Sequence, residues 1–367
     1  MRKLTFFHAS KTEKRIAATI SLFLMILLVF GLAASRTQAA ILENPVQTHA
    51  SAAIADNVFG VVIYPLDERG GLNLITDTQT KWVRGVEVHW SEVEPTQGVY
   101  NWLALESAET ELVNAINAGL TPIVLVRSAP LWASPNNLTD CVVAEAHFTA
   151  FGNFIAQVIS NTNSPLSAYT IPYWSIWNEP DVASGLTSPT GSFIGCWGDN
   201  DDPYYGGEAY GDMLEIIYPI IKAADPDTQI IAGELLLDCS PELDIECLPG
   251  KFFEGLLLST SSFDGVSFHG YDYYMGSLGQ YGNPNWNSGW NSSGPVLVSK
   301  AEYIARLLKS SGMSDKFIMN TEVALLCDTC DDDNDFEITK ASYVVQAYAR
   351  AIANGLEANI WFDVAGD

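Results

Sequence analysis

The stretch Tyr173-Trp174-Ser175-Ile176-Trp177-Asn178-Glu179-Pro180 places two polar residues directly after an apolar, aromatic run. Such a run predicts a buried strand, and the proline predicts that the strand has ended. Asn178 and Glu179 would then emerge at the end of a sheet or barrel. A carboxylate flanked by tryptophans is placed to titrate abnormally and to act on a substrate. The plainer alternative is a solvated glutamate at an ordinary strand end.

On both sides of this stretch, strand-like segments alternate with helical ones. We expect strands at 57–64, 82–90, 121–126, 171–177, 229–237, 263–269, 317–321 and 358–362. We expect helices at 102–118, 144–160, 208–224, 251–258, 298–310 and 338–353. Each gap between strands suits one crossover, so the pattern predicts an α/β fold, a (β/α)8 TIM barrel. No GxGxxG sequence opens a helix, which disfavours a dinucleotide-binding sheet.

Two segments depart from a regular barrel. The segment 65–81 has little helical signal, so we expect an irregular first crossover. The sequence ends at Asp367, shortly after the eighth predicted strand. We therefore expect that the C-terminal helix of the barrel is missing, with a fragment of a longer protein as the alternative.

The N-terminal 40 residues have the pattern of an export signal. A basic start precedes a nearly uncharged apolar run at 16–34, and small residues follow at 37–40. The run is also about long enough to span a bilayer, so the alternative is an uncleaved N-terminal membrane anchor. We divide the chain into this signal peptide or anchor at 1–40, a linker at 41–56 and a catalytic domain at 57–367.

The charge balance restricts the partners of the protein. Its formal net charge is −26, although the first 40 residues hold six of the 18 basic residues and one of the 44 acidic ones. A surface this acidic repels nucleic acid and anionic membranes and favours a neutral partner. Ten tryptophans supply stacking surfaces that suit a carbohydrate. We expect a secreted protein with a carbohydrate substrate.

All six cysteines lie after the predicted signal, which favours disulfides in an exported protein. Cys239 and Cys247 are one local pair and Cys327 and Cys330 are another, which leaves Cys141 with Cys196. The alternative for Cys327-Asp-Thr-Cys330 is half of a zinc site. The acidic run 328–335 is expected to be a solvated loop, with calcium binding as its alternative. We expect no metal and no cofactor.

Two glutamates follow strands that lie across the barrel mouth from each other. Glu179 follows the fourth predicted strand, and Glu322 ends the seventh. The carboxyl ends of the strands form the active face of such barrels. Two facing carboxylates are what glycosidic bond cleavage needs: one donates a proton to the leaving oxygen, and the other attacks the anomeric carbon or activates water.

On these residues the sequence resembles the clan A (β/α)8 glycoside hydrolases, over about residues 57–365. Trp177-Asn178-Glu179-Pro180 is the most specific match, and Thr321-Glu322 matches the nucleophile strand. The resemblance implies that Glu179 is the general acid/base, that Glu322 is the nucleophile and that Asn178 binds the sugar 2-hydroxyl. Xylosidase/iduronidase-like, β-galactosidase-like and cellulase-like branches stay open.

The resemblance also implies a set of substrate-binding residues. Arg84 would hold the nucleophile ionised, His269 and Tyr271 would contact the sugar or the nucleophile, and Trp361 would form an aromatic floor. Trp90 opens a run to Trp102 that is similar to the exit motif of the second strand. Two plainer alternatives remain: Arg84 could pair structurally with Glu87 or Glu94, and His269 could be a core histidine.

These features predict a retaining glycoside hydrolase with its two carboxyl groups about 5–5.5 Å apart, whereas a separation of about 9 Å would indicate inversion. One alternative from another class is a catalytically inactive barrel that only binds glycans. A second is a metal-dependent hydrolase, which would need a cluster of His and Asp residues at the strand ends.

Overall fold

The computed structural model describes residues 57–62, 71–135, 142–183, 195, 197–275, 286–287, 290, 294–327, 330 and 334–362. All of them belong to the unit Ala53–Asp367. The predicted signal or anchor and the linker lie outside these residues, as do residues 363–367. The expected lack of a helix after the eighth strand therefore stays a prediction.

Parallel strands in the described part of the chain close into an eight-stranded barrel. They are β1 (Phe59–Val62), β2 (Trp82–His89), β3 (Thr121–Arg127), β4 (Tyr173–Ile176), β5 (Gln229–Leu235), β6 (Gly265–Tyr274), β8 (Phe317–Leu326) and β9 (Ala358–Trp361). The ring closes because β9 pairs with β1. The short β7 (Trp286–Asn287) adds to the rim, antiparallel to β6. The predicted (β/α)8 TIM barrel is confirmed.

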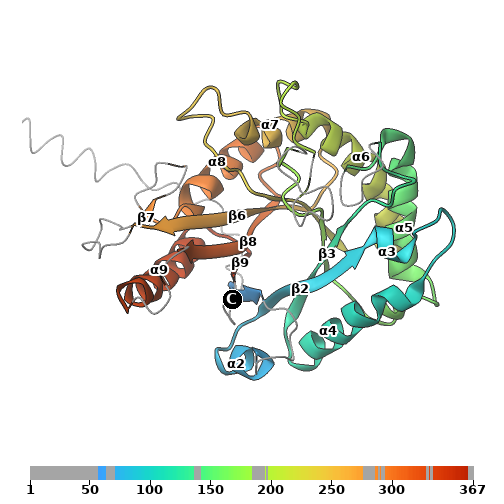
Figure 1. Ribbon diagram of the computed structural model, residues 1–367, viewed down its shortest axis with the longest axis horizontal. Helices are drawn as coiled ribbons and strands as arrows, with labels where there is room; N and C mark the ends of the chain where they lie inside the picture. The colour runs from blue at the N-terminus through green and yellow to red at the C-terminus, as the bar shows by residue number, and fades with distance from the viewer. Residues whose placement is uncertain are drawn as a thin grey trace, which may run out of the picture. The chain divides into compact units, whose positions relative to one another are not determined.

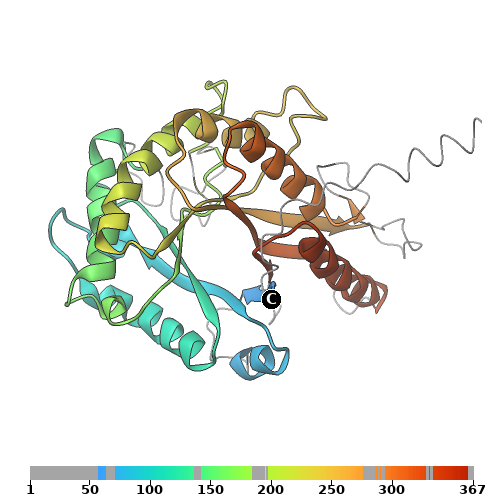
Figure 2. The same cartoon turned by 180° about the vertical axis from the view of Figure 1, so that it is seen from behind.

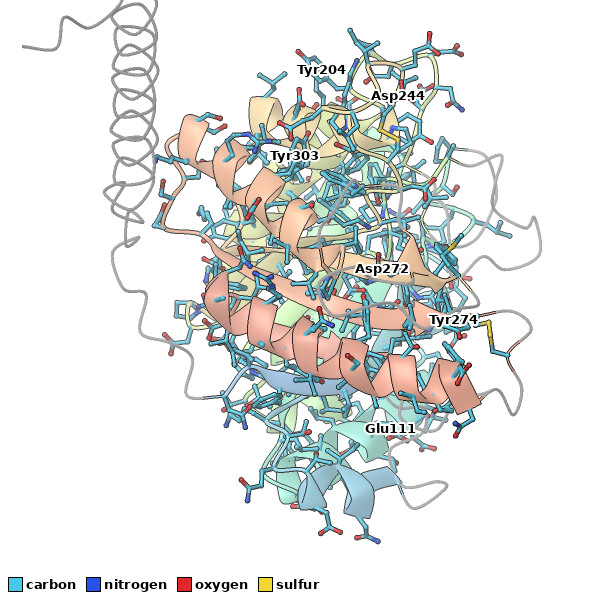
Figure 3. All side chains as sticks on the ribbon, turned by 90° about the vertical axis from the view of Figure 1, so that its left-hand side faces the viewer. Glu111, Tyr204, Asp244, Asp272, Tyr274 and Tyr303 are labelled. Carbon is cyan, nitrogen blue, oxygen red and sulfur yellow. A yellow bond between two sulfur atoms is a disulfide. The ribbon has the colours of Figure 1, made fainter. Side chains whose placement is uncertain are left out.

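Helices surround this ring, as Figures 1 and 2 show from its two sides. They are α2 (Gly71–Asp77), α4 (Glu106–Asn117), α5 (Phe148–Ser160), α6 (Gly207–Ala224), α7 (Phe252–Ser259), α8 (Leu297–Ser310) and α9 (Asn334–Ala353), with a single turn, α3 (Trp90–Val93), directly after β2. The prediction of an irregular first crossover is wrong at 71–77. Helix α2 forms there because Ile75 is buried in a small cluster with Val61 and Val83.

The barrel interior is apolar at one end and polar at the other. Near the start of the strands it is filled by Trp82, Ile123, Ile231, Met319 and Ile360. Further along some of these strands the buried side chains are polar: Arg84 lies two residues after Trp82, and Thr321 lies two residues after Met319. Layered filling of this kind is typical of the fold and leaves chemistry to the carboxyl ends of the strands.

Strands β6 and β8 are longer than predicted. They stay paired from Gly265 and Phe317 to Tyr273 and Leu326, with one register shift beside His269. Because the two strands satisfy each other's backbone groups, they extend beyond the rest of the barrel. The prediction that Glu322 ends its strand is therefore wrong: it lies inside β8.

Two predicted disulfides are present, Cys239–Cys247 and Cys327–Cys330. Because Cys327 and Cys330 are bonded to each other, neither sulfur is available as a zinc ligand. The alternative of half a zinc site is therefore wrong. Cys141 and Cys196 lie outside the described residues, as does most of the acidic run 328–335; Asn334 and Asp335 open α9. Among the helices that the structure describes, none combines the length and the apolar character needed to cross a membrane.

Candidate active site

A cavity of about 820 Å³ opens at the carboxyl ends of the strands. Both predicted catalytic residues, Glu179 and Glu322, line it, together with Arg84, Asn178 and Tyr271. These five residues come from β2, the end of β4, β6 and β8. Closure of the barrel brings them together, as the sequence predicted.

Glu179 is directed into the cavity by a sharp turn after β4. Trp177 and Glu179 have left-handed φ angles of 72° and 44°, which are uncommon for residues other than glycine and cluster at functional sites. The buried ring of Trp177 packs against Phe151 and Trp197 and anchors the turn. The Glu179 N–H donates to the carbonyl of Glu234 at 3.0 Å.

The environment of Glu179 favours its protonated form. Burial raises the pKa of its carboxyl to about 7, although the charges of Arg84 and Lys300 oppose the rise. Only 12% of the side chain is exposed. A carboxyl with this pKa exchanges a proton near neutral pH, which is what a general acid/base requires.

Glu322 sits among hydrogen-bond donors. Arg84 Nη1 lies 2.6 Å from Glu322 Oε1, and the Tyr271 hydroxyl donates to Oε2. A guanidinium and a hydrogen-bond donor both stabilise a carboxylate. The two glutamates therefore lie in opposite electrostatic environments within one cavity.

His269 lies between the two carboxyl groups. Its Nδ1 is 2.8 Å from Glu179 Oε1 and 3.4 Å from Glu322 Oε2. Burial lowers the pKa of the ring to about 4, so the imidazole is neutral. One ligand atom from each of the three residues lies within 4.8 Å of the others. An oxygen of Glu179 is therefore at most 4.8 Å from an oxygen of Glu322.

Arg84 binds Glu234 as well as Glu322, and its charge also acts on Glu87, one of the two acids in its structural alternative. It binds Glu234 through Nε and Nη2, at 3.0 and 2.6 Å, and its Nη2 also donates to Asn178 Oδ1. Glu94 accepts instead from Trp90 Nε1 and from a backbone N–H. Glu87 accepts from Arg127 and lies 3.1 Å from His89 Nε2.

Three predicted binding residues, Trp90, His269 and Trp361, are not among those that line the cavity. His269 is fully buried and contacts both carboxyl groups. Trp90 is fully buried and packs between Trp132 and Phe154. Trp361 packs instead against Tyr343 of α9.

The aromatic residue that does line the cavity is Phe362, directly after β9, whose ring centroid is 5.9 Å from that of Tyr271. Neighbouring residues of a strand face opposite sides, so an error of one position exchanges the inside for the outside. The aromatic position in the cavity is therefore one residue after the predicted one.

No protein-family model matches this sequence, and no curated protein matches it. Solved structures do match. A family 39 glycoside hydrolase from Bacteroides cellulosilyticus aligns with a TM-score of 0.58 and 19% identity, over 83% of this chain and 56% of its own. A β-glycosidase aligns at 0.56 and 16%, over 84% and 87%. A β-xylosidase from Caulobacter crescentus aligns at 0.53 and 14%, over 84% and 60%.

This chain has the fold of these glycoside hydrolases. It spans just over half the length of the family 39 enzyme.

Sequence reasoning missed one functional residue, Glu234. It is completely buried and binds Arg84 with both carboxylate oxygens. A signal was present, because Gly233-Glu234 interrupts an otherwise apolar predicted strand at 229–237. A charged residue inside such a strand requires a buried partner.

Proposed function

We propose that this protein is a secreted retaining glycoside hydrolase that cleaves an O-glycosidic bond of a carbohydrate. The observation that carries the proposal is the pair Glu179 and Glu322, whose nearest oxygens are at most 4.8 Å apart in a cavity of about 820 Å³. Retaining enzymes place the carboxyl groups about 5–5.5 Å apart, whereas inverting enzymes leave about 6.5–9.5 Å for a water molecule. The spacing here favours direct attack by one carboxylate.

Glu322 acts as the nucleophile and Glu179 as the acid/base. In the first step, Glu322 attacks the anomeric carbon while the bond to the leaving oxygen breaks and Glu179 gives that oxygen its proton. In the second step, Glu179 takes a proton from water, and the water oxygen displaces Glu322 from the anomeric carbon. Both carboxyl groups return to their initial protonation states, and the sugar keeps its anomeric configuration.

The other residues of the cavity support this sequence of steps. Arg84 and the Tyr271 hydroxyl both donate to Glu322 and hold its carboxylate in place for the attack. Asn178 is held by Arg84 and lies beside Glu179, where its amide can bind a sugar hydroxyl. Phe362 offers an apolar ring face to the sugar.

Export of the protein fits the same proposal. The apolar N-terminal segment predicts export, and the two disulfides suit an oxidising compartment. The acidic composition suits a neutral glycan substrate.

A metal-dependent reaction is the second candidate, because Glu179, His269 and Glu322 could each offer one ligand atom. The Arg84 guanidinium lies 2.6 Å from Glu322, and the Tyr271 hydroxyl donates to the other oxygen of the same carboxylate. These donors compete with a cation for Glu322 and favour the proton-transfer mechanism. Full activity in the presence of a chelator would agree with this preference, and loss that zinc or manganese restores would reverse it.

A panel of aryl glycosides tests the proposal. We expect hydrolysis of at least one member, with the first-formed sugar in the configuration of the substrate by proton NMR. Inversion would contradict the nucleophile assignment. Binding of glycans without turnover of any member would indicate the alternative of an inactive glycan-binding barrel.

A further inference from the structure

Glu234 is a third acidic residue in the centre of the barrel, and the two-carboxylate mechanism does not use it. It lies in β5, whose pairing with β6 shifts register between Gly233 and Leu235. The irregularity turns the side chain toward Arg84, as bulges commonly re-aim side chains next to active sites. Glu234 has a φ of 136°, in the region that favours glycine. A strained backbone at a buried charge indicates that this placement serves a function.

Glu234 is connected to both members of the proposed catalytic pair, directly to Glu179 and through Arg84 to Glu322. Its two oxygens hold Arg84 through Nε and Nη2, which leaves Nη1 to reach Glu322. A two-point contact of this kind fixes the plane of a guanidinium. Its backbone carbonyl accepts the N–H of Glu179. A change at Glu234 is therefore transmitted to the nucleophile through Arg84 and to the acid/base through the backbone.

The charge of Glu234 matters most after Glu322 has reacted. When Glu322 forms an ester with the sugar, it no longer carries the negative charge that pairs with Arg84. Arg84 is only 2% exposed, and a buried cation without a counter-ion is strongly unfavourable. A positive charge next to a sugar that develops positive charge also opposes both chemical steps. Glu234 supplies the counter-ion that Arg84 retains throughout.

Resting on the proposed hydrolase activity, we infer that Glu234 is a positioning residue: it orients Arg84 toward Glu322 and stays its counter-ion while Glu322 is esterified.

Glu234→Gln keeps the size of the side chain and removes its charge. We expect kcat on a hydrolysed aryl glycoside to fall about 100-fold. We expect KM to stay within about twofold of the wild-type value, because Glu234 is not among the residues that line the cavity. A merely structural role, which distorts the cavity as a whole, would raise KM together with the loss of kcat.

Two variants accompany this measurement. Glu234→Asp keeps the charge but shortens the reach, so we expect a smaller loss of kcat, of about 10-fold, again with KM close to the wild-type value. Glu242→Gln makes the same chemical change in an ion pair with Arg306 whose side chains are about half exposed, and should leave kinetics unchanged. Wild-type kcat in Glu234→Gln, or a loss of kcat accompanied by an equal rise in KM, would overturn the inference. If Glu234→Gln does not fold, an unchanged kcat in Glu234→Asp would overturn the inference.

A double-mutant cycle separates this inference from the proposed function, because it needs no substrate. Arg84→Met, Glu234→Gln and the double variant are compared by denaturant unfolding. We expect the two changes to be coupled by about 30-fold or more in the unfolding equilibrium constant. If the effects of the two substitutions on the unfolding equilibrium were additive, Arg84 and Glu234 would not interact and the inference would be overturned. Strong coupling in a protein that hydrolyses no glycoside would contradict the proposed function instead.

Discussion

Arg84 Nη1 lies 2.6 Å from Glu322 Oε1, although 238 positions of sequence separate the two residues. Strand β2 carries the arginine and β8 the glutamate, and the two side chains meet inside the barrel because β1 and β9, which lie between these strands, pair with each other. Both side chains are buried, so neither charge is compensated by water. The ion pair therefore links the stability of the fold to the placement of the proposed nucleophile.

Arg84→Met should destabilise the protein by about 3–5 kcal/mol, because it leaves two buried carboxylates, Glu234 and Glu322, without their cation. Urea unfolding at pH 7 measures the change. Adding Glu234→Gln to Arg84→Met should make the deficit smaller, because one of the two unpaired charges is then removed. A deficit that this second change does not relieve would mean that lost packing, not unpaired charge, causes it.

Glu322→Gly should abolish hydrolysis, because the attacking oxygen is removed and a space beside the anomeric carbon is left. Azide can enter that space and attack from the same face. We expect azide to restore release of the aryl group and to yield a glycosyl azide of inverted configuration, identified by NMR. A product of retained configuration would assign the nucleophile to a residue other than Glu322.

Glu179 should account for the basic limb of the activity profile. An acid must be protonated to donate, and burial raises the pKa of Glu179 to about 7. Wild-type kcat/KM should therefore fall as pH rises above about 7. In Glu179→Gln the limb should disappear, and dinitrophenyl glycosides, whose leaving groups need no proton, should lose far less activity than phenyl glycosides. Equal losses for both substrates would contradict the role of Glu179 as the acid.

The same carboxyl should also make stability depend on pH. Its pKa is about 7 when folded against 4.5 for an exposed glutamate, so the folded state binds more protons between these values and stability falls as pH rises through this window. At pH 8 the buried carboxylate should cost about 2–3 kcal/mol. Glu179→Gln removes that cost, so its stability gain over wild type should be larger at pH 8 than at pH 4. Unfolding at the two pH values measures this gain, with the exposed Glu242→Gln as the control.

Phe362 and Trp361 should respond differently to truncation. Phe362 lines the cavity, so Phe362→Ala should raise KM about 10-fold or more with little loss of stability. Trp361 packs against Tyr343, so Trp361→Ala should cost about 3 kcal/mol of unfolding free energy with a smaller effect on KM. Kinetics and thermal unfolding of both variants check the assignment. A reversed pattern would restore Trp361 as the aromatic floor.

Local patterns in the sequence were sufficient for most of the strands and helices and for one half of the proposed site. Apolar runs and helical spacing depend on near neighbours in the chain, so β4 and α6 are found close to their expected bounds. The Asn178-Glu179 pair after a buried strand indicated the acid/base for the same reason. The local disulfide pairs, Cys239–Cys247 and Cys327–Cys330, also followed from spacing.

Only the tertiary structure decided which side chains share the cavity. Barrel closure placed Arg84 against Glu322, and the irregularity in β5 brought Glu234 to the same guanidinium. A one-residue difference at the end of β9 put Phe362, and not Trp361, into the cavity. Alternation along a strand is visible in a sequence, but the register between distant strands is set by long-range pairing. The chemistry at Glu179 was therefore readable from the chain, and the electrostatic support of Glu322 arose only when the barrel closed.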